Sequence, residues 1–470
     1  MATRKSRPSP AAARPTPAER QAAGEAQRKA CERDWLSRAP KPGAAQRDPL
    51  GWLKASNRGR VPELVPLRHG RMMASPLAFY RGAASLMAND LSALPHSGVM
   101  THLCGDAHLA NFGFFASPER ALMFDINDFD ETLAGPFDWD LRRLATSFVI
   151  AARDRGFKAR VGRDAVAELT EAYRDHMRRF ARMDTLEAWY WRLTSQTLLK
   201  LGREDAAELA VIRKARSSTS RVFAQGATKK GADGLLMIRN KPPYVYHDAR
   251  ATQREIDRFR AGLPAFMAQY RASLAPERQQ LLDRYDLRDV AVLTPGVGSV
   301  GRRCFLLLLV ADQRHPLFLQ CKEAAASVLP NQPGAPAGPS IPAGRRVVEG
   351  QRLMQAASDV FLGWAGDAEG RAFYVRQLRD MKAAYKLEDF RAADLTEFAQ
   401  ACGYGLARAH AKGGDAWMLT GYLGRSTKFD AALADFAEAY ADVNQADFMR
   451  LQKAIANGKV KAMEESDEAA

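Results

Sequence analysis

Three short apolar runs between residues 99 and 126 constrain this chain most, because each run ends at polar or glycine-containing residues. The runs have the length of β-strands; they are Val99–Cys104, Phe112–Phe115 and Ala121–Ile126. The third run leads directly into residues 125–131, which contain four acidic residues and no basic residue. Carboxylates at the ends of neighbouring hairpin strands can converge, whereas carboxylates along one helix usually face water. The sequence therefore predicts one polar site, built from the loop 105–111 and this acidic segment.

The residue types at this predicted site favour oxygen ligation of a metal ion. Asp106, Asn111 and Asp128 supply carboxylate and amide oxygens without a cysteine, which suits a hard divalent cation and Mg²⁺ above all. A further carboxylate nearby suits a base that orients a hydroxyl nucleophile. Metal ligands, a base and an anion-binding loop are the parts that phosphoryl transfer requires. The structural alternative is a polar hairpin cluster whose aspartates cap turns.

The loop has a recognisable pattern: Gly105-Asp106-Ala107-His108-Leu109-Ala110-Asn111. It resembles the catalytic loop of the aminoglycoside phosphotransferase and choline kinase branch of protein-kinase-like enzymes, which has a Gly-Asp, a His two residues later and an Asn five residues after the Asp. Asp128 matches the metal-binding acid at the end of the third strand in that family. Asp140 resembles the structural aspartate that opens the next helix. Cys104 departs from the family, which usually has His there.

The resemblance implies a role for each of these residues. Asp106 would position or deprotonate the acceptor hydroxyl, and Asn111 and Asp128 would hold Mg²⁺. Asp125 or Asp130 would be auxiliary ligands, and the sequence leaves open which of the three aspartates holds the metal. His108 belongs to the catalytic loop in a supporting role, because a lone histidine is more often a hydrogen-bonded structural residue than a catalyst.

A glycine motif, Gly296-Val297-Gly298-Ser299-Val300-Gly301, follows much later in the chain. Such a GxGxxG is a weak signal by itself, and a dinucleotide-binding site would need a helix immediately after it. The β-like run Cys304–Val310 follows instead, so we expect the loop to join two strands. Strand–loop–strand glycine motifs cover phosphates in kinases, and Gly296, Gly298 and Gly301 are therefore predicted to cover the phosphates of ATP.

Lys322 ends the next predicted strand, Leu317–Cys321. In kinases the lysine of the third strand pairs with nucleotide phosphates and with a glutamate on the following helix. A helix predicted over Arg345–Trp364 places Glu349 at the head of an apolar stripe, so Lys322 and Glu349 are predicted to pair. The alternative for Glu349 is an exposed carboxylate in the first turn, where the helix dipole favours it.

The order of these parts differs from that of kinases, because the glycine loop follows the catalytic loop by about 190 residues. A helix predicted over Leu395–His410 resembles the one that precedes the catalytic loop in phosphotransferases. The chain therefore resembles a circularly permuted kinase-like fold, of the α+β class, with two lobes and a mostly helical large lobe. The predicted parts are a disordered basic tail (1–48), a helical lobe with the catalytic loop (49–285), a small β-rich nucleotide-binding lobe (286–382), helices completing the large lobe (383–455) and an acidic tail (456–470).

A second resemblance covers nearly the whole chain, from about residue 50 to 445. Its landmarks are Arg71-Met72, the segment SPLAFYRG at 75–82, the GDAHLANFG block, NDFDET at 127–132, and residues 406–415. They resemble an uncharacterised bacterial family known only as a domain of unknown function. That family brings no established activity, so the predicted chemistry depends on the kinase-like residues.

The formal net charge of +15 could indicate a nucleic-acid partner. The chain has 51 arginines and 18 lysines, however, and most arginines alternate with acidic residues. We therefore expect a surface rich in arginine and no specific nucleic-acid binding. The five cysteines are scattered without a CxxC pair, and the longest apolar run, Cys304–Ala311, is far shorter than a membrane span. These features predict a cytoplasmic protein without a membrane segment.

The predicted function is an ATP- and Mg²⁺-dependent phosphotransferase acting on a hydroxyl-bearing small molecule. Two other functions stay open: a nucleotide-binding pseudokinase or nucleotidyl-transferring regulator, suggested by Cys104 and the reordered lobes, and a metal-dependent hydrolase using His102, Asp106, His108 and Asp128. The acceptor pocket is expected from the helical region 150–280 or from Phe79-Tyr80-Arg81.

Overall fold

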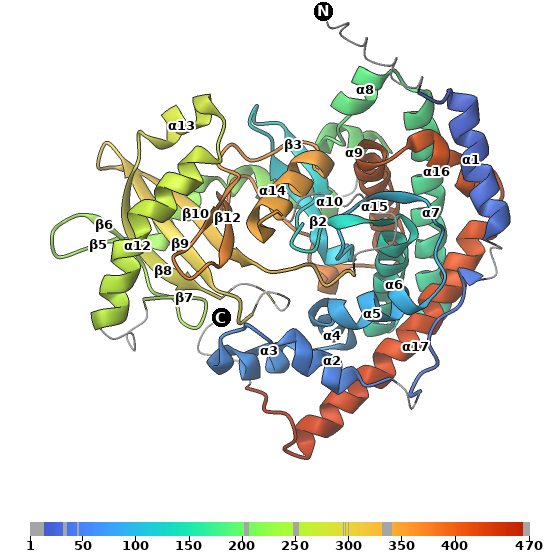
Figure 1. The fold of residues 1–470 in the computed structure, drawn as a ribbon, viewed down its shortest axis with the longest axis horizontal. Coiled ribbons are helices and arrows are strands. Elements are labelled where there is room, and N and C mark those ends of the chain that lie inside the picture. Colours follow the sequence, from blue (N-terminus) through green and yellow to red (C-terminus); the bar gives the residue numbers. More distant parts are fainter. Residues whose placement is uncertain are drawn as a thin grey trace, which may run out of the picture.

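The apolar runs in the second half of the chain form one antiparallel sheet of six strands, which Figure 1 shows beside a large helical layer. The computed structural model describes residues 14–31, 35–44, 47–201, 206–247, 253–294, 296, 298, 300–330 and 341–463. About half of the chain is helical, and the fold belongs to the α+β class, as predicted. No helix of the described residues is long and apolar enough to cross a membrane.

The sheet has the strand order β11-β12-β10-β9-β8-β7. Its strands are β7 (Val245–Tyr246), β8 (Asp286–Leu293), β9 (Cys304–Ala311), β10 (His315–Ala324), β11 (Gly363–Gly366) and β12 (Ala372–Gln377). β9 and β10 form the predicted hairpin, with Asp312 and Gln313 in its turn at φ of 48° and 58°. β12 pairs with β10 on one side and with the short β11 on the other.

Both faces of the sheet are covered, which explains why β9 is apolar at almost every position. Leu307 and Leu309 face a cluster with Phe266 and Tyr270 of α12 (Gln253–Ala272), which also includes Leu282 of α13 (Pro276–Leu282). Leu306 and Leu308 face the other side, where Ala224 of α11 (Ser220–Ala227) and Ile238 of β6 (Leu236–Ile238) pack. A short strand, β5 (Thr228–Lys230), pairs with β6. The layer around the sheet thus begins near residue 220, well before the predicted lobe boundary at 286.

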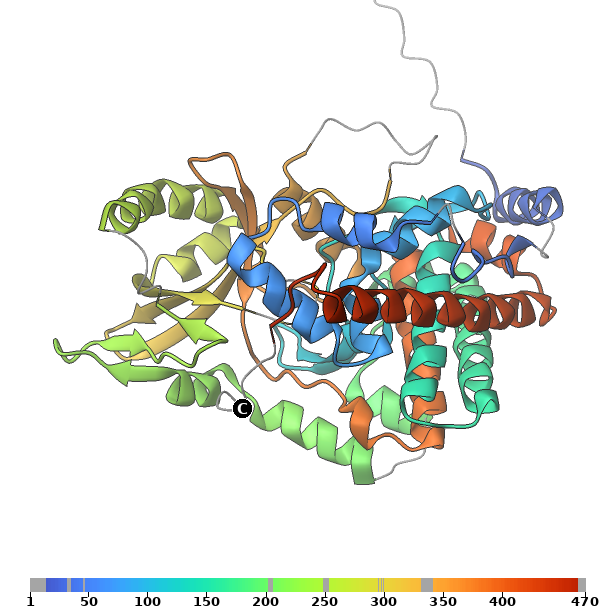
Figure 2. The ribbon, with the colours of Figure 1, turned by 90° about the horizontal axis from the view of Figure 1, so that it is seen from below.

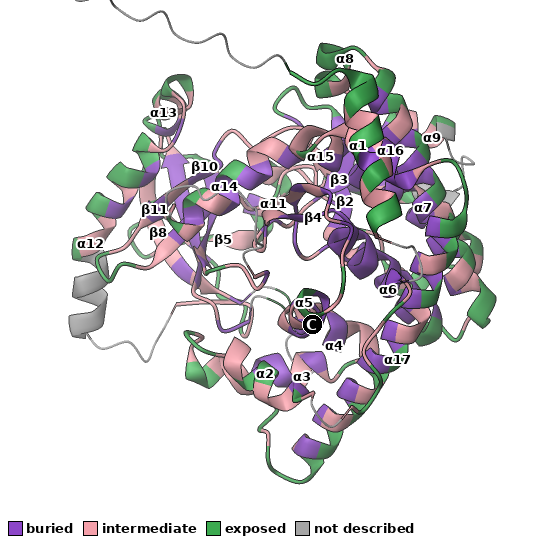
Figure 3. Ribbon diagram, turned by 45° about the vertical axis from the view of Figure 1, so that its right-hand side comes forward, coloured by how far each residue is buried: buried purple, intermediate pink, exposed green. Residues whose placement is uncertain are grey.

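Four long helices make the core of the other layer, and Figure 3 shows that α6 is buried along most of its length. They are α6 (Asp138–Asp154), α7 (Ala159–Arg182), α15 (Ala392–Gly413) and α17 (Lys428–Ala456). The apolar residues of α7 and α15 recur at three- and four-residue spacing, and the faces that they form are buried. Gly403 lets α15 approach α7 closely, because a Cβ there would lie 2.4 Å from the carbonyl oxygen of Leu169.

Helices α2–α5 close one side of the molecule and pack on the second half of α17, which Figure 2 shows alongside them. They are α2 (Pro49–Ser56), α3 (Val65–Met72), α4 (Pro76–Gly82) and α5 (Ala84–Ala93). Leu53, Met72, Phe79 and Leu86 each contribute one buried side chain to a cluster with Phe448 and Leu451 of α17. This packing fixes the polar side chains that α2–α5 turn toward the loop 105–111, which takes the name catalytic loop from its resemblance alone.

The predicted disordered tail contains a helix, α1 (Pro17–Ala30), so the prediction is wrong for this part of it. Thr16 and Glu19 form a capping box at its start. α1 packs on α16 (Ala416–Leu423) so closely that a Cβ at Gly24 would lie 2.0 Å from the carbonyl oxygen of Met418. Residues 1–13 and 464–470, which include the last seven residues of the predicted acidic tail, lie outside the described residues.

The three strands predicted around the catalytic loop are confirmed as β1 (Met100–Leu103), β2 (Phe112–Ala116) and β3 (Leu122–Ile126). β2 pairs with β3, whereas β1 pairs with an unpredicted strand, β4 (Leu133–Pro136). Leu103 at the end of β1 lies opposite Leu133 at the start of β4. The loop after β1 and the acidic segment before β4 are therefore neighbours, as the predicted convergence requires.

The helix predicted over Arg345–Trp364 is too long, because α14 spans only Ala343–Met354 and Trp364 lies in β11. Two backbone groups that would form hydrogen bonds of a longer helix are engaged elsewhere. The amide of Ala356 donates to Asp125, and the carbonyl of Met354 accepts from Arg408. Residues 331–340, which precede α14, lie outside the described residues.

Candidate functional site

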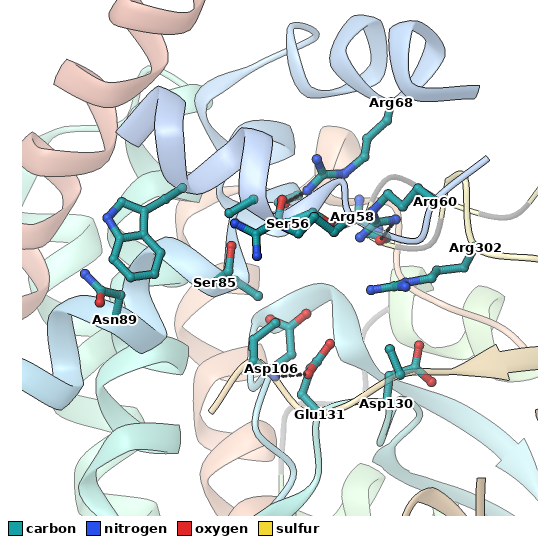
Figure 4. A pocket seen from close by; sticks show the side chains of 18 of the residues that line it. Ser56, Arg58, Arg60, Arg68, Ser85, Asn89, Asp106, Asp130, Glu131 and Arg302 are labelled. Atoms are coloured by element: carbon teal, nitrogen blue, oxygen red, sulfur yellow. Dashed lines mark hydrogen bonds between the residues drawn. The ribbon is translucent and has the colours of Figure 1, made fainter. Parts of the chain in front are cut away.

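A cavity of about 360 Å³ lies between the catalytic loop, the glycine loop and helices α2–α5 (Figure 4). Carboxylates line one side, namely Asp106, Asp128, Asp130, Glu131 and Glu323. Five arginines line the other side, namely Arg58, Arg60, Arg68, Arg81 and Arg302. In Figure 4, Arg60, Arg68 and Arg302 lie across the cavity from Asp106, Asp130 and Glu131. A ligand in this cavity would contact both signs of charge.

The backbone of the catalytic loop is held by the first turn of α6. Asp140 accepts hydrogen bonds from the amides of Cys104 (2.8 Å) and Gly105 (3.0 Å). Gly105 has φ of 86°, and a Cβ there would lie 2.3 Å from the carbonyl oxygen of Glu131. Only glycine fits this left-handed turn pressed against the acidic segment.

Asp106 is the loop carboxylate that reaches the cavity, with 21% of its side chain exposed. Arg143 of α6 donates through Nε to its Oδ1, and the Arg143 guanidinium also stacks on Tyr80, 4.4 Å from the ring centroid. Oδ2 of Asp106 lies 3.9 Å from Nε2 of His108. Arg143 thus fixes one carboxylate oxygen of Asp106 and leaves the other available to a ligand.

His108 lies behind the loop rather than in the cavity, with 3% of its surface exposed. Burial lowers the pKa of His108 to about 3, so its imidazole is neutral at physiological pH. Its backbone amide donates to the carbonyl of Asp106. This geometry suits a residue that supports the loop.

Asn111 and Asp128 connect the loop to the acidic segment. Nδ2 of Asn111 donates to the carbonyl of Asp106 (2.8 Å), and the amide of Asn127 donates to the carbonyl of Asn111 (2.8 Å). Burial and the neighbouring charge of Asp130 raise the pKa of Asp128, and no basic side chain of the described residues forms an ion pair with it. A cation beside Asp128 would relieve this unfavourable placement of a carboxylate.

Asn111 and Asp128 carry oxygen atoms of the kind that Mg²⁺ binds, but only Asp128 lines the cavity. No group of three or more His, Cys, Asp or Glu side chains in the described ranges is placed to hold a metal ion. Mg²⁺ commonly takes only one or two carboxylates from a protein and completes its shell with water and phosphate oxygens. Asn111 and Asp128 could supply such a partial set.

The carboxylate of Asp130 forms an ion pair with Lys322, which lies 192 residues away in the chain. Nζ of Lys322 donates to Oδ2 of Asp130, and the hydroxyl of Tyr374 donates to Oδ1 (2.7 Å). Lys322 and Tyr374 are paired across β10 and β12, so one carboxylate joins the acidic segment to the sheet. Burial alone would lower the pKa of Lys322, but the Asp130 carboxylate holds it well above its usual value.

The predicted pair between Lys322 and Glu349 is wrong, because Asp130 takes the place of the helix carboxylate. Glu349 lies on the outer face of α14, 44% exposed, and pairs with Arg345 at 2.7 Å. The buried face of α14 is formed by other residues, among them Val347, Val348, Gln351 and Met354. Glu349 is therefore exposed, as the alternative expected, but it lies beyond the first turn of α14, so the expected position at the helix start is wrong.

Asp125 lies behind the cavity in a buried ion pair. Its carboxylate oxygens accept from Nη2 of Arg408 at 2.9 and 2.8 Å, and one of them accepts from the amide of Ala356 at 2.7 Å. Both side chains are almost completely buried. Asp125 fastens β3 to α15 and to the end of α14, and does not line the cavity.

Asp125→Ala is expected to lower the free energy of unfolding by about 3–5 kcal/mol, because it leaves the Arg408 guanidinium buried without a partner. Asp128→Ala is expected to leave stability unchanged or to raise it, because the folded state raises the pKa of Asp128 and so disfavours its charge at neutral pH. Urea denaturation of both variants measures the difference. Equal destabilisation by the two substitutions would contradict these roles.

The glycine loop joins β8 to β9, as predicted. Gly298 lines the cavity, and a Cβ at Gly296 would lie 3.9 Å from the Arg81 guanidinium. Gly301 has φ of 84° and faces Arg60, which donates to the carbonyl of Gly298 at 3.0 Å. Residues 295, 297 and 299 lie outside the described residues.

The arginine side of the cavity was not predicted. Of the expected acceptor-pocket residues, Arg81 lines it, whereas Phe79 and Tyr80 are buried in the core. None of the lining residues comes from the region 150–280 within the described part of the chain. A signal was present in the basic run Arg58-Gly59-Arg60 and in Arg68. In the sequence these arginines look like the many surface arginines of this chain, so they could not be recognised as residues that line a cavity.

Comparison with known proteins identifies a family without assigning an activity. The model of a family described as "Uncharacterized protein conserved in bacteria (DUF2252)" matches residues 60–454. Neither the curated proteins nor the solved structures contain a significant match. The matched region includes the catalytic loop, the acidic segment, the glycine loop and Lys322, so the whole candidate site except Trp52, Ala55, Ser56 and Arg58 falls within it. The chain belongs to this uncharacterised bacterial family, DUF2252.

Proposed function

We propose that this protein is an ATP- and Mg²⁺-dependent phosphotransferase that acts on a hydroxyl-bearing small molecule. One observation carries the proposal: a single cavity is lined by Gly298 of the glycine loop, by Asp130, which holds Lys322, and by Asp106 and Asp128. The sequence separates these groups widely, and the fold brings them together in the combination that phosphoryl transfer uses.

A permuted kinase-like fold is the architecture that we propose for this site. Along the chain, β8, the glycine loop, β9, β10 with Lys322, α14, β11 and β12 follow one another, and α15 comes next. The end of α15 lies against the start of β1: the hydroxyl of Thr101 donates to the carbonyl of His410 at 3.2 Å. If the end of α15 were joined to the start of β1, the catalytic loop would follow α15 in the chain, as it does in phosphotransferases. This proximity supports the permutation.

The proposed reaction assigns each group a task. Asp106, oriented by Arg143, accepts a hydrogen bond or the proton from the acceptor hydroxyl. Lys322 donates to a phosphate oxygen, with Asp130 and Tyr374 keeping its ammonium group in place. Asn111 and Asp128 would hold Mg²⁺, which supplies positive charge to the phosphates when bound. The glycine loop lets backbone amides come close to the phosphates.

Lys322→Met is expected to weaken the binding of ATP with Mg²⁺ by about tenfold or more, because it removes a charge-assisted hydrogen bond to phosphate. Isothermal titration calorimetry of the wild type and the variant measures this change. Arg288→Gln is the matched control, because Arg288 is an exposed basic residue of β8 outside the cavity. Unchanged binding in Lys322→Met, or no binding by the wild type, would reject the proposal.

A nucleotide-binding protein without turnover is the second candidate. The observation in its favour is that Lys322 is already paired with the carboxylate of Asp130. Steady release of phosphate from ATP by the wild type would exclude this candidate. The hydrolase alternative has less support, because His102 does not line the cavity and burial lowers its pKa to about 4.

A further inference from the structure

The arginine side of the cavity is unusual because its charges have no carboxylate partners, although Arg68 is buried and Arg60, Arg81 and Arg302 are half-buried; Arg58 is exposed. Arg68 is 1% exposed, and its guanidinium donates to Oδ1 of Asn57 at 2.5 Å and to the carbonyl of Gly82 at 2.6 Å. Arg60 donates to the carbonyls of Ser56, Gly298 and Val300. Within the described residues, none of the five arginines that line the cavity forms an ion pair with a carboxylate.

Buried guanidinium groups without a counter-charge are costly, and these groups repel one another. Burial and the nearby charge of Arg302 lower the pKa of Arg60 to about 10, and burial also lowers the pKa of Arg68. The carboxylates across the cavity act on these arginines without pairing with them, and an anionic ligand between the arginines would supply a direct counter-charge. Guanidinium groups bind phosphate in a planar, two-pronged geometry, which makes phosphate the best-suited anion.

Four of the five arginines lie on a different segment from Lys322, although Arg60 also contacts the glycine loop through the carbonyl of Gly298. Arg58, Arg60, Arg68 and Arg81 lie on the α2–α4 segment, whereas Lys322 lies on the sheet. Beyond Asp106 the cavity continues between α2 and α5, where Ser85, Asn89 and Trp52 line it. Trp52 is 41% exposed. This part offers hydroxyl and amide groups to a polar molecule beside the proposed catalytic base.

We propose that the acceptor is itself a phosphorylated, hydroxyl-bearing small molecule, whose phosphate is held by Arg60, Arg68 and Arg81 while its hydroxyl faces Asp106. This inference rests on the proposed phosphotransferase function and adds the chemical class of the second substrate. Ser85 and Asn89 are the groups placed to bind its other hydroxyls. The same arginines could instead bind the phosphates of ATP, and the experiment separates these two sources.

The test is a phosphorus NMR titration with inorganic phosphate at constant ionic strength. One arm uses the protein alone, and the other uses protein saturated with a non-hydrolysable ATP analogue and Mg²⁺. We expect phosphate to bind in both arms with similar affinity. Binding that disappears when the analogue is present would assign the arginines to the nucleotide and overturn the inference, as would no binding in either arm.

Arg81→Gln is the informative variant, because Arg81 lines the cavity and donates no hydrogen bond to another described residue. Its substitution therefore leaves no acceptor of the described residues unsatisfied. We expect it to weaken phosphate binding about tenfold or more in both arms, while the exposed Arg425→Gln leaves it unchanged. Equal affinities in the two variants would overturn the inference. Failure of the ATP analogue to bind would reject the proposed nucleotide function, and this outcome is distinct from a loss of phosphate binding alone.

Discussion

Asp106→Asn is expected to lower the rate of Mg²⁺-dependent ATP hydrolysis, with water in place of the acceptor, by about 10²- to 10⁴-fold, the usual contribution of a general base. The amide has the shape of the carboxylate and can still accept from Arg143, so the loop keeps its conformation. It cannot accept a proton. Steady-state phosphate release measures the rate, and calorimetry should show that the affinity for ATP with Mg²⁺ is retained.

The matched control for this prediction is Asp312→Asn, an exposed aspartate in the β9–β10 turn outside the cavity. It should hydrolyse ATP at the wild-type rate. Wild-type hydrolysis by Asp106→Asn would show that the reaction does not use this carboxylate. A variant that also loses its affinity for ATP would point to a binding role for Asp106.

Asp128→Asn is expected to weaken the binding of ATP in the presence of Mg²⁺ by about tenfold or more, because a metal ligand loses its charge. In the presence of EDTA the wild type and the variant should bind ATP with similar affinity. The difference between the two conditions identifies a metal role, since a general loss of binding would affect both. Isothermal titration calorimetry with and without Mg²⁺ measures all four affinities.

Asp130→Asn provides the comparison for this second prediction, because Asp130 lies two residues away but is already engaged by Lys322 and Tyr374. Its substitution should weaken binding in both conditions, through the loss of order at Lys322. A loss of affinity confined to the Mg²⁺ condition in Asp130→Asn, with equal losses in both conditions in Asp128→Asn, would exchange the roles that we assign to these two aspartates.

The parts of the site that the sequence predicted are those set by local pattern. Short apolar runs that end at glycine or aspartate identified β1, β2 and β3, and with them the neighbouring positions of Asp106 and Asp128. Unbroken apolar runs around a polar turn identified β9 and β10 in the same way. β4 was missed because Leu133–Pro136 is short and contains Ala, Gly and Pro, which rarely indicate a strand.

The parts that were missed depend on contacts between distant segments. The partner of Lys322 could not be chosen from sequence, because Asp130 and Glu349 are both carboxylates and only the orientation of α14 turns Glu349 outward. Asp125 resembled a metal ligand until the position of Arg408, 283 residues away, was known. The arginines of the cavity were hidden by the high arginine content of the whole chain. Helix α1 was missed although Thr16 and Glu19 have the spacing of a capping box.

A crystal structure with a non-hydrolysable ATP analogue and Mg²⁺ tests the central claim most directly. The account predicts that the terminal phosphates lie between Gly298 and Lys322, with the metal ion on Asp128 and Asn111 and with Asp106 facing the terminal phosphate. A nucleotide bound elsewhere, or a metal ion on Asp125 or Glu349 instead, would contradict the account.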